Sequence, residues 1–511
     1  MKMKLSVILI ALAAVMVSSC KKQLDINKDP DNPSLDQLTP KLVFPSAVAS
    51  SAGRIGGDLA ILGGIWAQFY TQNTTSNQYK NIDAFNLTKS DFGSTTISSP
   101  WAELYSGSLN DLNFVIKKAT EQEDWTYVLL GTVIKAYTLQ VLVDLYDQVP
   151  YSEAFQGIGN LQPKFDDGYS VYKGLLAELN AALAKDFNAS TNSSPGAYDL
   201  LWPGTGATIE QQEADWKSAG NLQKWIRFAN TLKLKMYLRM VYAKPAEADA
   251  GIKAMYTAGA QFLKEDASLK LFQNAENKSN PLFEFNNRKL NTDANLKASV
   301  TFLSWLQANG DPRIDNYFLP RTGSTTQYLG INQGDFLNPD PLFNNASKAN
   351  ISPTDPVDFI SLAESHFLQA EALERYFGGA GAKAEYDAGV TASFARYGDN
   401  AAPLLAGAYA YPTAGTFEQK LEAIITQKWA SMPKSHSLEA FFERNRTGYP
   451  RTSTVYSTDV SYVPGRFVYP KNGVTNGLFP KRLIFPDIER SKNPNTPPEE
   501  PITKKVWWDV R

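Results

Sequence analysis

The chain has 511 residues, and its 43% hydrophobic content is enough to bury a large core. Its 50 lysine and arginine residues nearly balance 52 aspartate and glutamate residues, so no basic excess supports nucleic-acid binding. Two histidines and one cysteine argue against metal chemistry, whereas 12% aromatic residues favour packed or stacking surfaces.

The first 20 residues predict an export signal that ends in a lipid-modified cysteine. Lys2 and Lys4 precede an apolar stretch over residues 5–17, and two serines lead to Cys20. About a dozen apolar residues are too few to cross a bilayer, which takes ~20. The pattern is similar to a bacterial lipobox, with a signal peptide over 1–19 and acylation at Cys20. The alternative is a plain secretory signal with an incidental cysteine, which could form no internal disulfide.

Residues 20–40 are interpreted as the lipid anchor and a tether. The turn-forming string DPDNP at 29–33 lies in this segment. Residues 41–511 are expected to form one domain. No later segment approaches 18 uninterrupted apolar residues, so the lipid is the only predicted attachment to a membrane.

Apolar residues recur every three or four positions over long stretches, a spacing that predicts amphipathic helices. In residues 125–145 this spacing joins Leu130, Ile134, Tyr137, Val141 and Leu145. Further helices are predicted over 101–119, 169–184, 222–242, 246–258, 359–377, 382–397, 417–429 and 438–444. Several adjoin in pairs with short links, as helical hairpins do.

An Ala-x3-Phe spacing at 363–367 matches a tetratricopeptide helix, although no strict 34-residue repeat is present. Long segments rich in Asn, Ser, Thr, Gly and Pro separate the helices, at 53–100, 188–219, 272–298, 312–356 and 448–501. Their aromatic residues argue against disorder, so we expect ordered loops that carry the binding surface. The predicted fold is mainly α, with irregular tetratricopeptide-like helix pairs, a loop-rich portion and little β structure.

A series of short motifs runs in one order along nearly the whole chain. These are CKK at 20–22, LDIN at 24–27, DPDNP at 29–33, WAQFY at 66–70, DLYDQVPYSEA at 144–154, PKFD at 163–166, KWIRFANTLKL at 224–234, QKW at 427–429, RTGYP at 446–450 and WWD at 507–509. Together they resemble the SusD/RagB family, in particular its SusD-like branch. The family usually has Gly where Asp147 stands and a second Arg where Asn445 stands.

The resemblance implies a nutrient-binding lipoprotein that is anchored by lipid to the outer membrane and faces the exterior. Such proteins work with a SusC-like TonB-dependent outer-membrane transporter, to which they present an oligosaccharide or a peptide. The resemblance implies no catalysis and no cofactor. It also supplies no site motif, because the ligand-contacting residues of the family vary with the ligand.

From the residues themselves, most of these motifs are interpreted as structural. Trp225 lies on the apolar face of a predicted helix, and Gly448 is expected to end a helix in a special backbone conformation. Pro150 cannot continue the preceding helix, so Tyr151 is expected to pack back on the hairpin. Trp507 and Trp508 are expected to pin the C-terminus to the body.

Ligand-contacting residues are therefore sought among loop aromatics with neighbouring amides, because sugars offer apolar ring faces and hydroxyl groups. Trp66 follows the apolar residues 61–65, so a place in a helix core is favoured over ligand contact, and each loop aromatic could instead pack on the scaffold. The candidates are Trp66, Tyr70, Asn77, Tyr79, Trp202, Tyr317 and Tyr328.

No catalytic or metal-binding pattern is found in the sequence. His366 falls in a predicted helix and His436 in a polar turn, and neither has a partner at metal-ligand or nucleophile-relay spacing. Carboxylates are plentiful, so a glycosidase pair could be recognised only by its spatial separation. The alternatives to a binding lipoprotein are a secreted all-helical glycoside hydrolase or polysaccharide lyase and a structural assembly subunit.

Overall fold

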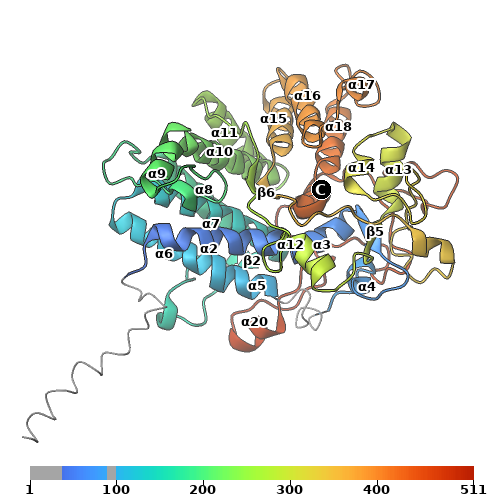
Figure 1. The fold of residues 1–511 in the computed structure, drawn as a ribbon, viewed down its shortest axis with the longest axis horizontal. Helices are drawn as coiled ribbons and strands as arrows, with labels where there is room; N and C mark the ends of the chain where they lie inside the picture. Colours follow the sequence, from blue (N-terminus) through green and yellow to red (C-terminus); the bar gives the residue numbers. More distant parts are fainter. Residues whose placement is uncertain (1–36, 89–98) are drawn as a thin grey trace, which may run out of the picture.

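The computed structural model describes residues 37–88 and 99–511, so the predicted signal peptide, Cys20 and most of the tether lie outside the described residues. Helix α2 (Pro40–Ile55) begins where Thr39 accepts a hydrogen bond from the backbone N–H of Leu42. It leads into α3 (Asp58–Trp66), in which every residue is buried. Both helices cross the middle of the molecule (Figure 1).

The predicted helix over 101–119 is present but divided. It consists of α5 (Ser99–Glu103), a π-helical turn η1 (Leu104–Leu109) and α6 (Asn110–Glu121). Helix α7 (Trp125–Tyr146) follows with Asp124 as its N-cap, within one residue of the prediction. Among the described helices, α7 alone is long and apolar enough to cross a bilayer, yet 94% of its most apolar window is buried in the body. That burial fits a central core helix.

The remaining long helices are α8 (Gly168–Leu183), α9 (Ile209–Ser218), α10 (Asn221–Arg239), α11 (Pro245–Thr257), α15 (Leu362–Tyr376), α16 (Ala382–Ala395), α18 (Phe417–Ala430) and α19 (Ser437–Thr447). Helix α8 pairs with α7, α10 with α11, α15 with α16 and α18 with α19, and α9 lies beside α10. In Figure 1 the pairs form an arc from α8 through α10 and α11 to α15, α16 and α18. This arrangement confirms the predicted mainly α fold of tetratricopeptide-like helix pairs.

Strands are few and short in the described residues. They form three antiparallel pairs: β1 (Tyr70–Gln72) with β5 (Leu296–Ala298), β2 (Gln148–Val149) with β3 (Asp166–Asp167), and β4 (Ala267–Leu269) with β6 (Val357–Ile360). The predicted helix over 359–377 is wrong at its start, because Phe359 and Ile360 belong to β6. The helix itself begins at Leu362, with Ser361 as its N-cap.

The segments predicted as loops contain several short helices. These are α3, α4 (Lys80–Asp83), α9, α12 (Pro281–Phe283), α14 (Ile314–Tyr317) and α20 (Asp487–Lys492); α13 (Val300–Asn309) and α17 (Ala402–Leu405) were also not predicted. The remaining helical elements of the described residues are short turns: η2 (Gly157–Gly159), η3 (Gly196–Tyr198), η4 (Glu284–Arg288), η5 (Pro341–Asn345) and η6 (Lys434–His436). Helices this short span too few turns for a periodic apolar pattern to reveal them.

A buried network of charges joins the helix pairs at their inner ends. Arg239 on α10 contacts Asp144 on α7 (Nε to Oδ2, 3.1 Å), and also Glu439 and Glu443 on α19. Lys428 on α18 lies 3.1 Å from Glu443. Burial favours a raised pKa for Glu443, but the charges of Arg446, Lys428 and Arg239 hold that pKa well below its usual value. The helix pairs are thus joined by shared ion pairs as well as by apolar packing.

Several family motifs meet at this network, which confirms that they are structural. Trp225 and Trp508 are fully buried, and Gly448 ends α19 with a φ of 78°. Asp147, at the position where the family usually has Gly, adopts a φ of 71° and accepts a hydrogen bond from Trp507 N through its side chain (2.6 Å). Asn445 is buried and donates to the carbonyl oxygen of Pro480 (3.1 Å). Both departures from the family pattern are therefore accommodated.

Candidate functional site

Five of the sequence-predicted site residues have no ring surface to offer a ligand: Trp66, Tyr70, Tyr79, Trp202 and Tyr317 are all buried, at 6% exposure or less. Their polar groups are used inside the protein. The Tyr79 hydroxyl donates to Asn286, and the Tyr317 hydroxyl donates to the carbonyl oxygen of Ala430. A ring enclosed in this way cannot stack on a sugar, so these five residues are reassigned to the scaffold.

The other two candidates, Asn77 and Tyr328, remain accessible. They lie on loops that meet through a hydrogen bond between Thr74 and Asn344 (3.1 Å). Asn344 belongs to η5, whose Leu342 lines the same hollow as Tyr328. The fold therefore connects the loops that carry Asn77 and Tyr328.

This hollow, which we call the Tyr328 cleft, is open and has a volume of about 650 Å³. Its lining comes from α13, from the loop after α14 and from η5, and consists of Gln307, Arg321, Thr326, Gln327, Tyr328, Leu329 and Leu342. An aromatic ring, two amides, a hydroxyl and a guanidinium are thus gathered in one place. This is the combination that a sugar ring with its hydroxyl groups requires.

The loop that carries Tyr328 is held in shape by its own hydrogen bonds. Arg321 N donates to the carbonyl oxygen of Gln327 (2.7 Å), and Gln327 N donates to Ser324 Oγ (3.0 Å). The Tyr328 hydroxyl donates to Asp315, and partial burial together with that carboxylate raises the pKa of Tyr328. The hydroxyl is therefore already engaged, and the half-buried ring is the part of Tyr328 available to a ligand.

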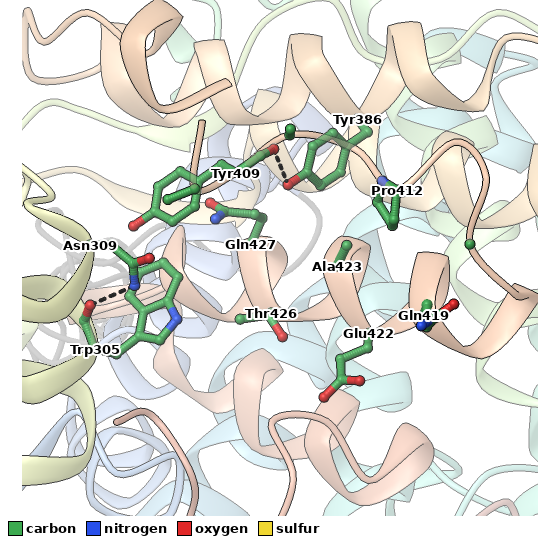
Figure 2. A pocket seen from close by; sticks show the side chains of 13 residues that line it. Trp305, Asn309, Tyr386, Tyr409, Pro412, Gln419, Glu422, Ala423, Thr426 and Gln427 are labelled. Carbon is green, nitrogen blue, oxygen red and sulfur yellow. Dashed lines mark hydrogen bonds between the residues drawn. The ribbon is translucent and has the colours of Figure 1, made fainter. Parts of the chain in front are cut away.

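A second hollow, the Trp305 groove, lies on the other side of α13 and has a volume of about 380 Å³. Figure 2 shows Trp305, Asn309, Tyr386, Tyr409, Glu422 and Gln427 around it. Trp305 is only 9% exposed and lies parallel to Tyr409, with ring centres 5.2 Å apart. Asn309 donates to the Trp305 carbonyl (2.8 Å), and Tyr386 donates to the Tyr409 carbonyl (2.9 Å). The side chains that line the Trp305 groove therefore stack on or hydrogen-bond mainly to one another.

A third hollow of about 550 Å³ is mostly apolar and lies between α5 and α20. Trp101, Tyr105 and Phe155 form its wall, and the exposed Leu161 and Ile488 stand at its rim. Apolar groups make up most of its exposed lining, whereas polar and apolar groups are nearly balanced in the Tyr328 cleft. Of the three, the Tyr328 cleft is the best candidate for ligand capture. Sequence reasoning found Tyr328 through its loop, but missed Gln307, because α13 was not predicted.

Both histidines have structural partners. His366 contacts Glu385 and His436 contacts Glu364, each at 2.6 Å. Within residues 37–88 and 99–511, no group of three His, Cys, Asp or Glu side chains is arranged to hold a metal ion. Neither histidine lines any of the three hollows described above.

Comparison with protein families gives a match over residues 64–470 to a SusD-like family described as "Starch-binding associating with outer membrane". The chain belongs to the SusD-like family. This membership confirms the resemblance drawn from the motifs. A comparison with curated proteins gives no match.

Solved structures of SusD homologues share the fold. A SusD homologue from Bacteroides uniformis is 22% identical with a TM-score of 0.72, over 92% of this chain and 99% of that one. A chitin-binding SusD homologue from Flavobacterium johnsoniae is 22% identical with a TM-score of 0.73, over the same shares. A SusD-like protein from Bacteroides thetaiotaomicron is 21% identical with a TM-score of 0.69, over 91% and 99%. At this identity the likeness establishes the SusD-like fold.

Proposed function

We propose that this SusD-like protein is a cell-surface lipoprotein that captures an oligosaccharide, or a peptide, and delivers it to a TonB-dependent outer-membrane transporter. The observation that carries the capture step is the Tyr328 cleft, where an aromatic ring lies beside amide, hydroxyl and guanidinium groups. The starch-binding description of the family and the chitin-binding relative support a glycan as ligand.

Capture without hydrolysis fits the chemistry of the cleft. Glycosidases use two carboxyl groups roughly 5 to 9.5 Å apart, one on each side of the scissile bond. The lining of the Tyr328 cleft contains no carboxylate, and nearby Asp315 is engaged by Tyr328. In the Trp305 groove, the single carboxylate of the lining belongs to Glu422, which pairs with Arg451 at 2.6 Å. These arrangements favour a binding protein over the hydrolase alternative.

Calorimetric titration of the purified protein with starch oligosaccharides, chitin oligosaccharides and peptides tests the capture step. We expect one class to bind without being turned over. The variant Tyr328→Ala should lose about 1 kcal/mol, roughly fivefold in affinity, because it removes the ring. Tyr328→Phe is the matched control and should stay within about twofold, since the hydroxyl already serves Asp315.

Other outcomes of the same titration would contradict the proposal. Release of shorter products from any glycan would identify a hydrolase or lyase. A folded protein that binds neither a member of the panel nor an acidic glycan would favour a structural assembly subunit. Equal affinity of the wild type and Tyr328→Ala for a bound glycan would move the site away from this cleft.

Delivery to a transporter is supported by the predicted lipid attachment at Cys20. Sixteen residues separate Cys20 from Gln37, where the described body begins, and they can span at most ~55 Å. The body would thus stay close to proteins of the same membrane. A TonB-dependent barrel should co-purify with the full-length protein from native outer membranes in mild detergent. Its absence, with glycan binding intact, would contradict delivery and leave capture standing.

A further inference from the structure

The Tyr328 cleft contains an arginine whose charge has no acidic partner. Nε and Nη2 of Arg321 both donate to Oε1 of Gln327, at 2.9 and 2.5 Å, so a neutral amide holds one edge of the guanidinium. Within residues 37–88 and 99–511, no carboxylate lies within ion-pair distance of Arg321. An arginine has five N–H donors, so both on Nη1 and one on Nη2 are left to face the cleft or water.

Arg451, which pairs with a residue of the Trp305 groove, shows the contrasting arrangement. Its Nε and Nη2 donate to the two carboxylate oxygens of Glu422, at 2.7 and 2.6 Å. The guanidinium of Arg451 is therefore matched by a carboxylate of the protein, whereas that of Arg321 is oriented by an amide and keeps its charge uncompensated. A guanidinium that is oriented in this way and has no acidic partner is preorganised to bind an external anion.

A second cation without an acidic partner lies behind the η5 wall of the cleft. Lys297 on β5 is only 1% exposed, and its Nζ donates to the carbonyl oxygens of Ala346 (2.8 Å) and Asn344 (3.3 Å). Burial and the charge of Lys348 lower the pKa of Lys297 to about 8, against the opposing effect of Asp293. The protonated Lys297 places positive charge behind this wall, and its lowered pKa means that this charge is lost more easily than that of an exposed lysine.

The acidic side chains on the neighbouring segments serve the protein itself. Asp315 accepts the hydrogen bond from the Tyr328 hydroxyl, and Asp340 caps η5 by accepting from Leu342 N (2.9 Å). Neither forms an ion pair with Arg321. Both carboxylates keep their negative charge, but each is bonded to a donor of the protein, so the guanidinium N–H groups that Gln327 leaves unused remain available to a ligand.

We propose that the Tyr328 cleft takes an acidic glycan, whose carboxylate or sulfate group binds the free edge of Arg321 while an adjacent sugar ring contacts Tyr328. The planar guanidinium can donate two parallel hydrogen bonds to such a group, which is the strongest form of this contact. The inference rests on the proposed capture function and names the class of glycan that the same cleft selects.

The test compares four tetrasaccharides: galacturonate, chondroitin sulfate, maltotetraose and chitotetraose. We expect at least one acidic member to bind roughly tenfold more tightly than the neutral ones, by an amount that shrinks as NaCl is added. Arg321→Gln should abolish this preference, and Arg451→Gln, as the matched control, should retain it. Preference for galacturonate identifies a carboxylate as the recognised group. If chondroitin sulfate alone is preferred, unsulfated chondroitin, which keeps the glucuronate carboxylate, distinguishes the sulfate from the carboxylate.

Thermal unfolding confirms beforehand that each variant is folded. Equal binding of acidic and neutral members, or a preference that survives in Arg321→Gln, would overturn the inference. If a neutral glycan alone binds and Tyr328→Ala lowers its affinity, the capture function is supported and the acidic specificity is contradicted. If the panel of the previous section and these four glycans all fail to bind, both fall together.

Discussion

The indole Nε1 of Trp508 donates a 2.8 Å hydrogen bond to Oδ1 of Asp144, across a separation of 364 positions in the chain. The same carboxylate accepts from the Tyr172 hydroxyl (2.6 Å) and pairs with Arg239. The last residues of the chain are thereby fastened to the central helix α7. A buried carboxylate needs several such partners, because desolvation of the charge is costly.

Removal of the Trp508 ring should be costly for stability. Trp508→Ala would leave a cavity and remove one donor from Asp144, so we expect a loss of about 3 to 5 kcal/mol in the free energy of unfolding. The neighbouring Trp507 is only partly buried and serves as control; Trp507→Ala should cost less than half as much. Urea titration followed by circular dichroism measures both. Equal losses would show that Trp508 has no special role.

The stability of the protein should depend on the ionisation of Asp58. Among the residues that the structure describes, this buried side chain has only Arg54 (3.5 Å) and Leu59 N (3.1 Å) as partners, and burial raises its pKa from 3.8 to about 7. Because the folded state then binds the proton more tightly than the unfolded state, this term weakens stability as pH rises from about 4 to 7.

The nearly isosteric Asp58→Asn removes that term. Relative to the wild type, the variant should gain stability between pH 4.5 and pH 8, by up to about 4 kcal/mol. Urea unfolding midpoints at the two pH values supply the comparison. A difference between the two proteins that stays constant with pH would contradict the raised pKa.

Two helical glycines should respond to alanine in opposite directions. A Cβ on Gly63 in α3 would lie 2.4 Å from the Cα of Leu438, so α3 and α19 would have to move apart. We expect Gly63→Ala to destabilise the protein by at least ~2 kcal/mol. A Cβ on Gly53 in α2 meets no atom within 4 Å. Gly53→Ala should therefore stabilise by about 0.5 to 1 kcal/mol, and thermal unfolding of the pair measures the contrast.

The lipid attachment predicted at Cys20 can be tested in cells. Cys20→Ala should release a folded protein that still binds glycan but no longer supports uptake of that glycan. Fractionation of the native host, with immunoblotting of membrane and medium, measures the release. Ser19→Ala changes the preceding residue without removing the thiol and should stay in the membrane. Membrane retention of Cys20→Ala would contradict the lipid interpretation.

Most of the long helices could be predicted from the sequence because their apolar faces repeat over several turns, as between Leu130 and Leu145 in α7. The 16-residue α2 was not predicted. Short elements could not be predicted. Val357–Ile360 is a β-favouring stretch that pairs with β4. The helix predicted over 359–377 wrongly included its last two residues. The all-buried α3 has no polar face, so nothing in its periodicity distinguishes it from other apolar segments.

The site was predictable only in part, because a loop aromatic looks the same in sequence whether it is buried or exposed. Tyr79 lies among Asn, Gln and Ser residues, yet a single hydrogen bond from its hydroxyl to Asn286, 207 positions away, allows its burial. Tyr328 stays accessible because its own hydrogen bond is to Asp315 at the exposed edge of its loop. Such long-range partners are set by the fold and leave no local pattern.

The shared carboxylates of the charge network have a mechanical consequence. Glu364 contacts Lys235 and Lys428 from two different helices, and Glu443 contacts both Arg239 and Lys428. If one helix pair swung away from the next, a charge would be left bare in an apolar interior, at a cost of several kcal/mol. We therefore expect the body to move as one rigid unit.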